Sequence, residues 1–113
     1  MSVILPNSQN NMKIKYNTIY DTNRLVIGNC TIYSGNKLFL HYHDFDEVYM
    51  ITEGIGEVYN GEKWVIARKG DIFKFKAGTY HGAMAAENYP LKFTYMFLNG
   101  PFNTIKYYGK SNL

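Results

Sequence analysis

Glycine, asparagine and aspartate divide this sequence into short apolar runs, and that division constrains the fold more than any other feature. The runs are mostly about four to eight residues long and rich in aromatic and β-branched side chains, which is typical of strands. None of them has the length and the 3.6-residue spacing of an amphipathic helix. Regular short strands separated by turns predict an all-β protein, either a sandwich or a closed barrel.

The turn signals give the expected strands their limits. Glu53-Gly54 is expected to end one strand, and Asn60-Gly61 predicts a hairpin, because both central positions of a tight hairpin turn favour positive φ. Gly28 is expected at a bulge. The expected extended segments are residues 13–20, 24–33, 38–43, 47–52, 56–59, 63–67, 72–75, 80–85 and 91–98, with a short candidate at 105–108.

The size and cysteine content indicate one domain without a disulfide. A chain of 113 residues with 46% hydrophobic side chains can bury a core of its own. Cys30 is the single cysteine, so no intrachain disulfide can form. Because its neighbours are apolar, we expect Cys30 to be a buried structural thiol and not a nucleophile.

The charges and the N-terminus argue against nucleic-acid and membrane partners. The net charge is only +3 and the basic residues are scattered, so no basic patch for nucleic acid is expected. No apolar stretch approaches the ~18 residues needed to span a bilayer. The first residues lack the basic start and long apolar run of a signal peptide, so a cytoplasmic location is expected.

All three histidines lie between residues 41 and 81, and together with one glutamate they form a candidate metal site. His41 and His43 are two apart on an expected strand, so their side chains share a face. Glu47 follows a tight turn, and His81 would reach the same point from a distant strand across the barrel. This donor set suits Fe, Mn, Ni, Cu or Zn. A His-x-His pair alone is weak evidence, and ordinary hydrogen-bonded histidines are the alternative.

The spacing around these residues resembles the two motifs of the cupins. Gly35-x5-His41-x-His43-x3-Glu47-x6-Gly54 resembles the first motif at every defined position, and Gly70-x5-Lys76-x-Gly78-x2-His81-x3-Ala85 resembles the second. In the second motif a proline and an asparagine usually stand where Lys76 and Ala85 are. The two motifs cover about residues 35–85, and the sequence is similar to single-domain, RmlC-like cupins.

The resemblance implies a fold, a ligand set and an oligomer. The fold would be a double-stranded β-barrel, or jelly roll, with a divalent transition metal held by His41, His43, Glu47 and His81. Single-domain cupins often pair, so a homodimer is expected. Residues 1–20 would be an N-terminal arm or edge strand that forms the dimer, and residues 21–113 would be the barrel.

Strand parity and the resemblance suggest further residues for a substrate pocket. Tyr49 is two residues from a ligand and is the candidate catalytic acid or base, with a core aromatic as the alternative. Lys76 would bind an anionic substrate if it pointed inward, or lie in a solvated turn otherwise. The full set of pocket candidates is Tyr33, Phe39, Ile51, Lys76, Ala83 and Ala85.

Two kinds of function follow from the resemblance. One is a metal-dependent enzyme that acts on a small polar molecule, with a weak preference for sugar-related substrates, by isomerase, lyase or dioxygenase chemistry. The other is a barrel that binds or senses a small ligand without catalysis. A purely structural barrel would need three histidines and a glutamate to coincide at ligand spacing. Some cupin barrels precede DNA-binding helices, but only a short stretch follows Leu98 in this sequence, so no DNA-binding role is expected.

Overall fold

The computed structural model describes residues 8–10 and 13–102, and every regular element in that part of the chain is a β-strand. No helix there is long and apolar enough to cross a membrane. The strands are β1 (Ser8–Asn10), β2 (Ile14–Asp21), β3 (Leu25–Ile32), β4 (Lys37–His41), β5 (Asp46–Tyr59), β6 (Trp64–Arg68), β7 (Ile72–Phe75), β8 (His81–Ala85) and β9 (Leu91–Leu98).

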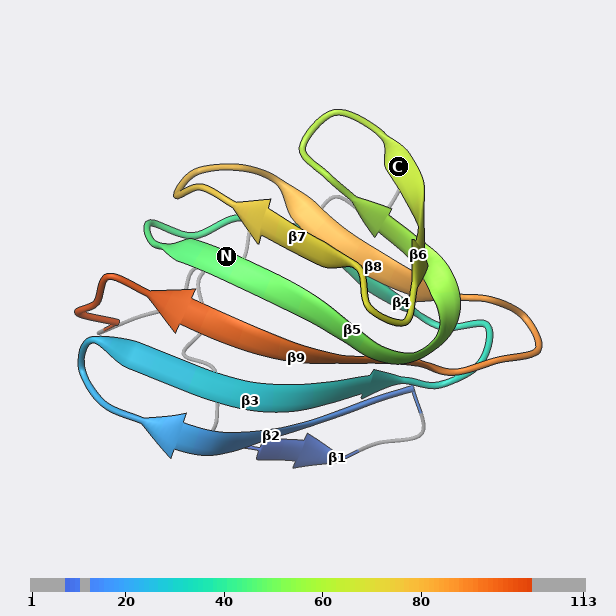
Figure 1. Ribbon diagram of the computed structural model, residues 1–113, viewed down its shortest axis with the longest axis horizontal. Helices are drawn as coiled ribbons and strands as arrows, with labels where there is room; N and C mark the ends of the chain where they lie inside the picture. Colours follow the sequence, from blue (N-terminus) through green and yellow to red (C-terminus); the bar gives the residue numbers. More distant parts are fainter. Residues whose placement is uncertain (1–7, 11–12, 103–113) are drawn as a thin grey trace.

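The strands form one curled antiparallel sheet whose two layers face each other (Figure 1). One layer contains β1, β2, β3, β9, the first half of β5 and β7. The other contains β6, the second half of β5, β8 and β4. The expectation of an all-β double-stranded barrel is therefore confirmed.

Strand β5 belongs to both layers because it bends without breaking. Its pairing with β9 shifts register between Ile51 and Glu53, which leaves Thr52 as the extra residue of a bulge. Before the bulge the odd-numbered residues are buried, and after Gly54 the even-numbered ones are. The sequence predicted a strand end at Glu53-Gly54, and the structure corrects this to a bend within one strand of 14 residues.

The Asn60-Gly61 hairpin is present, but its turn is not the tight type that the sequence suggested. Tyr59 pairs with Trp64, so four residues connect the strands. Gly61 has a φ of 103°, whereas Asn60 does not have a positive φ. The Asn60 side chain instead accepts hydrogen bonds from the backbone N–H groups of Glu62 and Lys63, at 2.9 and 3.0 Å.

Gly28 lies opposite a bulge and beneath an aromatic ring. The register shift falls in β2, between Thr18 and Tyr20, across from Gly28. A Cβ atom on Gly28 would lie 2.3 Å from the ring of Tyr95. Glycine therefore gives Tyr95 the space to lie across β3, and this close approach matters for the cavity described below.

The core lies between the two layers and follows the alternation of the strands. In β9 every second residue is buried, and these residues are Leu91, Phe93, Tyr95 and Phe97. The N-terminal strand β1 pairs with β2 at one end of the strand order. That residues 1–20 pair two copies of the chain stays a prediction, and the candidate strand at 105–108 lies outside the described residues.

Gly54→Ala should destabilise the protein strongly. Gly54 has a φ of 89°, and a Cβ atom there would lie 1.8 Å from the carbonyl oxygen of Pro90. The positive φ and the overlap with the backbone together should cost about 3 kcal/mol or more in the free energy of unfolding, measured in urea. The neighbouring Glu53→Ala removes an exposed carboxylate and should cost about 0.5 kcal/mol or less. Equal midpoints of urea unfolding for the two variants would contradict this account of the bend.

Candidate metal centre

Four buried side chains meet at one end of the space between the layers. They are His41 at the end of β4, His43 in the following loop, Glu47 in β5 and His81 at the start of β8. One ligand atom from each lies within 4.8 Å of all the others. The strand expected over residues 38–43 ends at His41, and His81 is the direct register partner of His41, so it comes from the adjacent strand and not from across the barrel.

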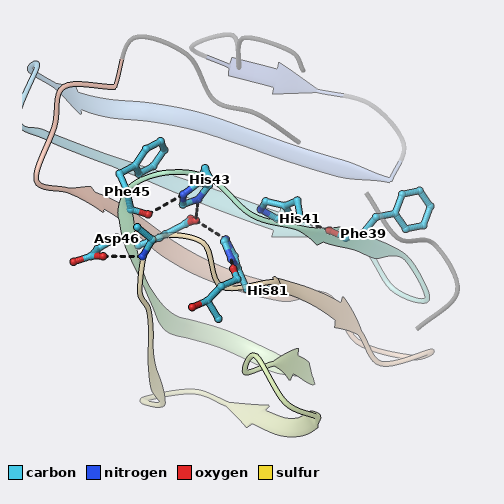
Figure 2. Close-up of polar contacts among 9 residues, drawn as sticks. Phe39, His41, His43, Phe45, Asp46 and His81 are labelled. Carbon is cyan, nitrogen blue, oxygen red and sulfur yellow. Dashed lines mark hydrogen bonds and ion pairs between the residues drawn. The ribbon is translucent and has the colours of Figure 1, made fainter. Parts of the chain in front are cut away.

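Each imidazole is held by a backbone carbonyl two residues away (Figure 2). A carbonyl oxygen only accepts, so Nδ1 carries the hydrogen in each ring. In the neutral form each ring would then present the lone pair of Nε2 to the centre, as a metal ligand must. The three bonds run from Nδ1 of His41 to Phe39 (2.8 Å), of His43 to Phe45 (2.9 Å) and of His81 to Thr79 (2.9 Å).

The Glu47 carboxylate brings a third acceptor to the same point. Its Oε1 oxygen lies 2.8 Å from Nε2 of His43 and 2.8 Å from Nε2 of His81. With Nδ1 already carrying the hydrogen, neutral rings would direct two nitrogen lone pairs at a carboxylate oxygen. The lone pairs and the carboxylate oxygen would repel one another unless positive charge, from protons or a metal ion, compensates them.

The donor set and the distances fit a divalent transition metal. Atoms bound about 2.0–2.2 Å from one ion lie roughly 3 Å apart when they are neighbours in its shell. The two 2.8 Å separations at Glu47 are of this size. Three imidazole nitrogens and one carboxylate oxygen suit Fe, Mn, Ni, Cu or Zn, and the arrangement does not distinguish among them.

Two of the imidazoles are also fixed by stacking on phenylalanines. The ring of His43 lies 3.9 Å from that of Phe45 with an interplanar angle of 10°. The ring of His81 lies 4.5 Å from that of Phe75 with an angle of 16°. Packing and hydrogen bonds together leave these rings little rotational freedom, which prepares them for a ligand role.

Asp46 joins the two segments that carry ligands. Its Oδ1 oxygen accepts a hydrogen bond of 2.9 Å from the backbone N–H of Ala77. The backbone N–H of Gly78 donates to the carbonyl of His43 at 2.8 Å. The turn that leads into His81 is thereby tied to the loop that carries His43.

Burial and neighbouring groups shift the ionisation of two members of the centre. Burial, together with the nearby His81, lowers the pKa of His41 from 6.5 to about 3, so this ring is neutral at neutral pH. Burial alone would raise the pKa of Glu47. Hydrogen bonds from His43 and His81 outweigh it and lower that pKa from 4.5 to about 2.

A cavity of about 250 Å³ adjoins the centre. Its wall is mostly apolar, with Ile14, Leu38, Phe93 and Phe97. Three tyrosines and a thiol complete the wall, namely Tyr16, Tyr49, Tyr95 and Cys30. His41 and Glu47 also line it, so an ion at the centre would face a space suited to a small molecule.

Tyr49, the candidate acid or base, lines this cavity, whereas none of the six substrate-pocket candidates does. Its ring is 1% exposed and packs edge-on against His81, with ring centroids 5.9 Å apart. The remaining candidates lie elsewhere. Three of them are exposed. Tyr33 lies before β4, Phe39 lies on the outer face of β4, and Lys76 lies in a turn. Ile51, Ala83 and Ala85 are buried in the core.

The sequence did not identify the groups that line the far part of the cavity. Cys30 was expected to be a buried structural thiol, and it is buried but also faces the cavity. The alternation in β9 places Phe93, Tyr95 and Phe97 on one face. Which face lines a cavity depends on strand neighbours that the alternation does not reveal.

Comparison with known families agrees with this geometry. Residues 30–97, more than half of the chain, match the family model described as "Cupin domain". The chain belongs to the cupin family. No curated protein is similar enough in sequence to this cupin to count as a relative.

Solved structures share the fold of this cupin at low sequence identity. An uncharacterised conserved protein with a double-stranded β-helix domain from Klebsiella pneumoniae superposes with a TM-score of 0.76 at 21% identity, over 93% of this chain and 90% of that one. KdgF from Halomonas sp. superposes with a TM-score of 0.73 at 23% identity, over 85% of this chain and 88% of that one. The polyketide cyclase RemF from Streptomyces resistomycificus superposes with a TM-score of 0.73 at 12% identity, over 94% of this chain and 78% of that one.

Asp46→Ala should weaken metal binding although it removes no candidate ligand. Without this carboxylate the turn that positions His81 loses its bond to the His43 loop. Loss of a group that orients a ligand typically costs about 10–100-fold in metal affinity. Competition with a chromophoric zinc chelator would measure the change. Asp44→Ala removes a nearby exposed carboxylate and is the matched control, so an equal loss in both variants would indicate a general charge effect.

Acid should destabilise the metal-free protein. His41 has a lowered pKa, so as the pH falls from 6.5 towards about 3 the unfolded chain takes up a proton that the folded chain refuses. Glu47 adds to the loss between pH 4.5 and about 2, because its folded pKa is also lowered. Stability to urea should therefore decline steadily below pH 6.5. His41→Gln cannot gain this charge and should decline less between pH 6.5 and 4.5, whereas parallel curves would contradict the assignment.

Proposed function

We propose that this cupin is a metal-dependent enzyme that acts on a small molecule in the cavity, by isomerase, lyase or dioxygenase chemistry. The observation that carries the proposal is the convergence of the Glu47 carboxylate with three imidazoles in a buried site, where protons or a metal ion must balance the converging acceptors. His41, His43, Glu47 and His81 would hold the ion. A bound divalent ion supplies a Lewis acid that polarises a carbonyl or enolate oxygen.

The chain contributes positioning and exclusion of water. The stacked phenylalanines and the Asp46 bond hold the imidazoles in place, and the aromatic cavity wall lowers the local polarity. Tyr49 is the candidate that would hold or move a proton, since it lines the cavity beside His81. The fold is compatible with catalysis, since the similar RemF is a polyketide cyclase.

Small-ligand binding without catalysis is the second candidate, and the ionisation of the cavity wall favours it. Burial raises the pKa of both Tyr16 and Cys30 to about 12, and it raises that of Tyr95. These groups are neutral at neutral pH and cannot act as strong bases there. Apart from the candidate ligands and Tyr49, the wall therefore offers no obvious general base.

His43→Ala should abolish metal binding. The wild type, purified without a histidine tag and reconstituted with Zn²⁺, should retain about one equivalent, and the variant less than about a tenth of one. Zn²⁺ should also raise the melting temperature of the wild type alone, because it binds only the folded chain. Asp44→Asn changes a neighbouring exposed carboxylate and should behave as the wild type. A wild type that retains no transition metal would overturn the proposal.

Turnover separates the two candidate functions. Metal-loaded protein can be tested for oxygen uptake and product formation with keto acids, sugars and aromatic acids. Tyr49→Phe should keep its metal and lower kcat by about 100-fold if the hydroxyl transfers a proton. Saturable binding of a compound with no turnover, equal in wild type and Tyr49→Phe, would instead favour a binding or sensing role.

A further inference from the structure

Tyr16 presents a buried hydroxyl group that the fold does not satisfy. The residue lies in β2, is only 9% exposed and lines the cavity. Among the described residues its hydroxyl oxygen has no hydrogen-bond partner, although it is fully buried. Buried hydroxyl groups without a partner are uncommon because they cost free energy, so this one calls for an explanation.

The surroundings of Tyr16 place it at the opposite side of the cavity from the metal centre. Tyr16 pairs with Cys30 across β2 and β3, and Cys30 pairs with Phe93 of β9. Glu47 lies in β5, three strands from β2 in the same layer, and pairs with Phe97 of β9 (Figure 1). The cavity thus runs from a carboxylate and an imidazole to a phenol, with aromatic rings between them.

A second phenol faces the same part of the cavity. Tyr95 reaches over Gly28, where a side chain would collide with its ring, and its hydroxyl lies 3.4 Å from that of Thr18. Burial keeps the phenols of Tyr16 and Tyr95 and the Cys30 thiol protonated, since it raises the pKa of each. This end therefore offers neutral hydrogen-bond donors and no charge.

The wall between the two ends selects against very polar molecules. Leu38, Phe93 and Phe97 leave few partners for the hydroxyl groups of a sugar, which would lose water without replacement. A planar or apolar body has few hydrogen bonds to water, so it would lose little free energy when it enters the cavity. This contrasts with the weak preference for sugar-related substrates that the tyrosine content of the sequence suggested.

We propose that the cavity takes a small molecule with an aromatic or similarly apolar body, an anionic or carbonyl group at the metal centre, and a neutral oxygen at the far end that accepts a hydrogen bond from Tyr16. The metal end of this inference rests on the proposed function. The far end rests on the buried hydroxyl and the wall alone.

Isosteric probe pairs test the inference. In 4-hydroxybenzoate and 4-methylbenzoate the carboxylate and ring are the same, and a hydroxyl replaces a methyl group of similar size. Zinc-loaded wild type should bind 4-hydroxybenzoate about tenfold more tightly by calorimetry, because only this probe satisfies Tyr16. Tyr16→Phe should remove or reverse that ratio. Tyr20→Phe, at an exposed tyrosine of the same strand, should preserve it.

Phenol and toluene repeat the comparison without a metal-binding group. Titrated by NMR into metal-free protein, phenol should bind more tightly to the wild type, and Tyr16→Phe should lose this preference. If zinc does not bind but the phenol preference is present, the proposed function fails and the role of Tyr16 stands. A ratio unchanged by Tyr16→Phe in both pairs, or tighter binding of D-xylose than of either benzoate, would overturn the inference.

Discussion

A buried carboxylate oxygen faces two buried imidazole nitrogens, and this arrangement constrains the structure around it. The backbone carbonyls hold a hydrogen of each ring on the outer nitrogen, so the inner nitrogens offer electron pairs unless they are also protonated. Glu47 offers another. Convergence of this kind is unfavourable in a protein interior without positive charge between the groups. The arrangement of strands and loops around the centre can be understood as the means of holding these groups together.

Several parts of the chain share that task. Strand β5 carries Glu47 and takes part in both layers, so the ligand sits on the element that connects the sheet. Asp46, next to Glu47, ties down the turn before His81. Phe45 and Phe75 support two of the rings from behind. The centre therefore depends on contacts from segments that are distant in sequence, which is typical of a site built on a rigid scaffold.

The sequence predicted the fold and the four candidate ligands because both depend on local spacing. His41, His43 and Glu47 lie within seven residues, and the turns that bound the strands have clear glycine and asparagine signals. Cavity-lining residues were harder to predict. Ile51, Ala83 and Ala85 have the expected parity but lie in the core, because parity gives a face and not a neighbour across the sheet. The bend at Gly54 was predicted to be the end of a strand, since a glycine with positive φ is compatible with either.

Tyr16 and Tyr95 escaped prediction for a related reason. Their contribution to the cavity arises from pairing among β2, β3 and β9, and the space for Tyr95 depends on a glycine in another strand. No sequence pattern near the tyrosines predicts either feature. Long-range register is the information that a single sequence lacks.

The backbone bonds that orient the three imidazoles have a consequence for how such a barrel can change over time. The acceptor of each Nδ1–H group is a main-chain carbonyl two positions away, so these three bonds involve no side chain of the cavity wall. Substitutions along that wall can therefore alter the shape of the cavity while these three bonds persist. The shape of the cavity and the orientation of the imidazoles thus depend on different atoms, with Tyr49 as a residue that contributes to both.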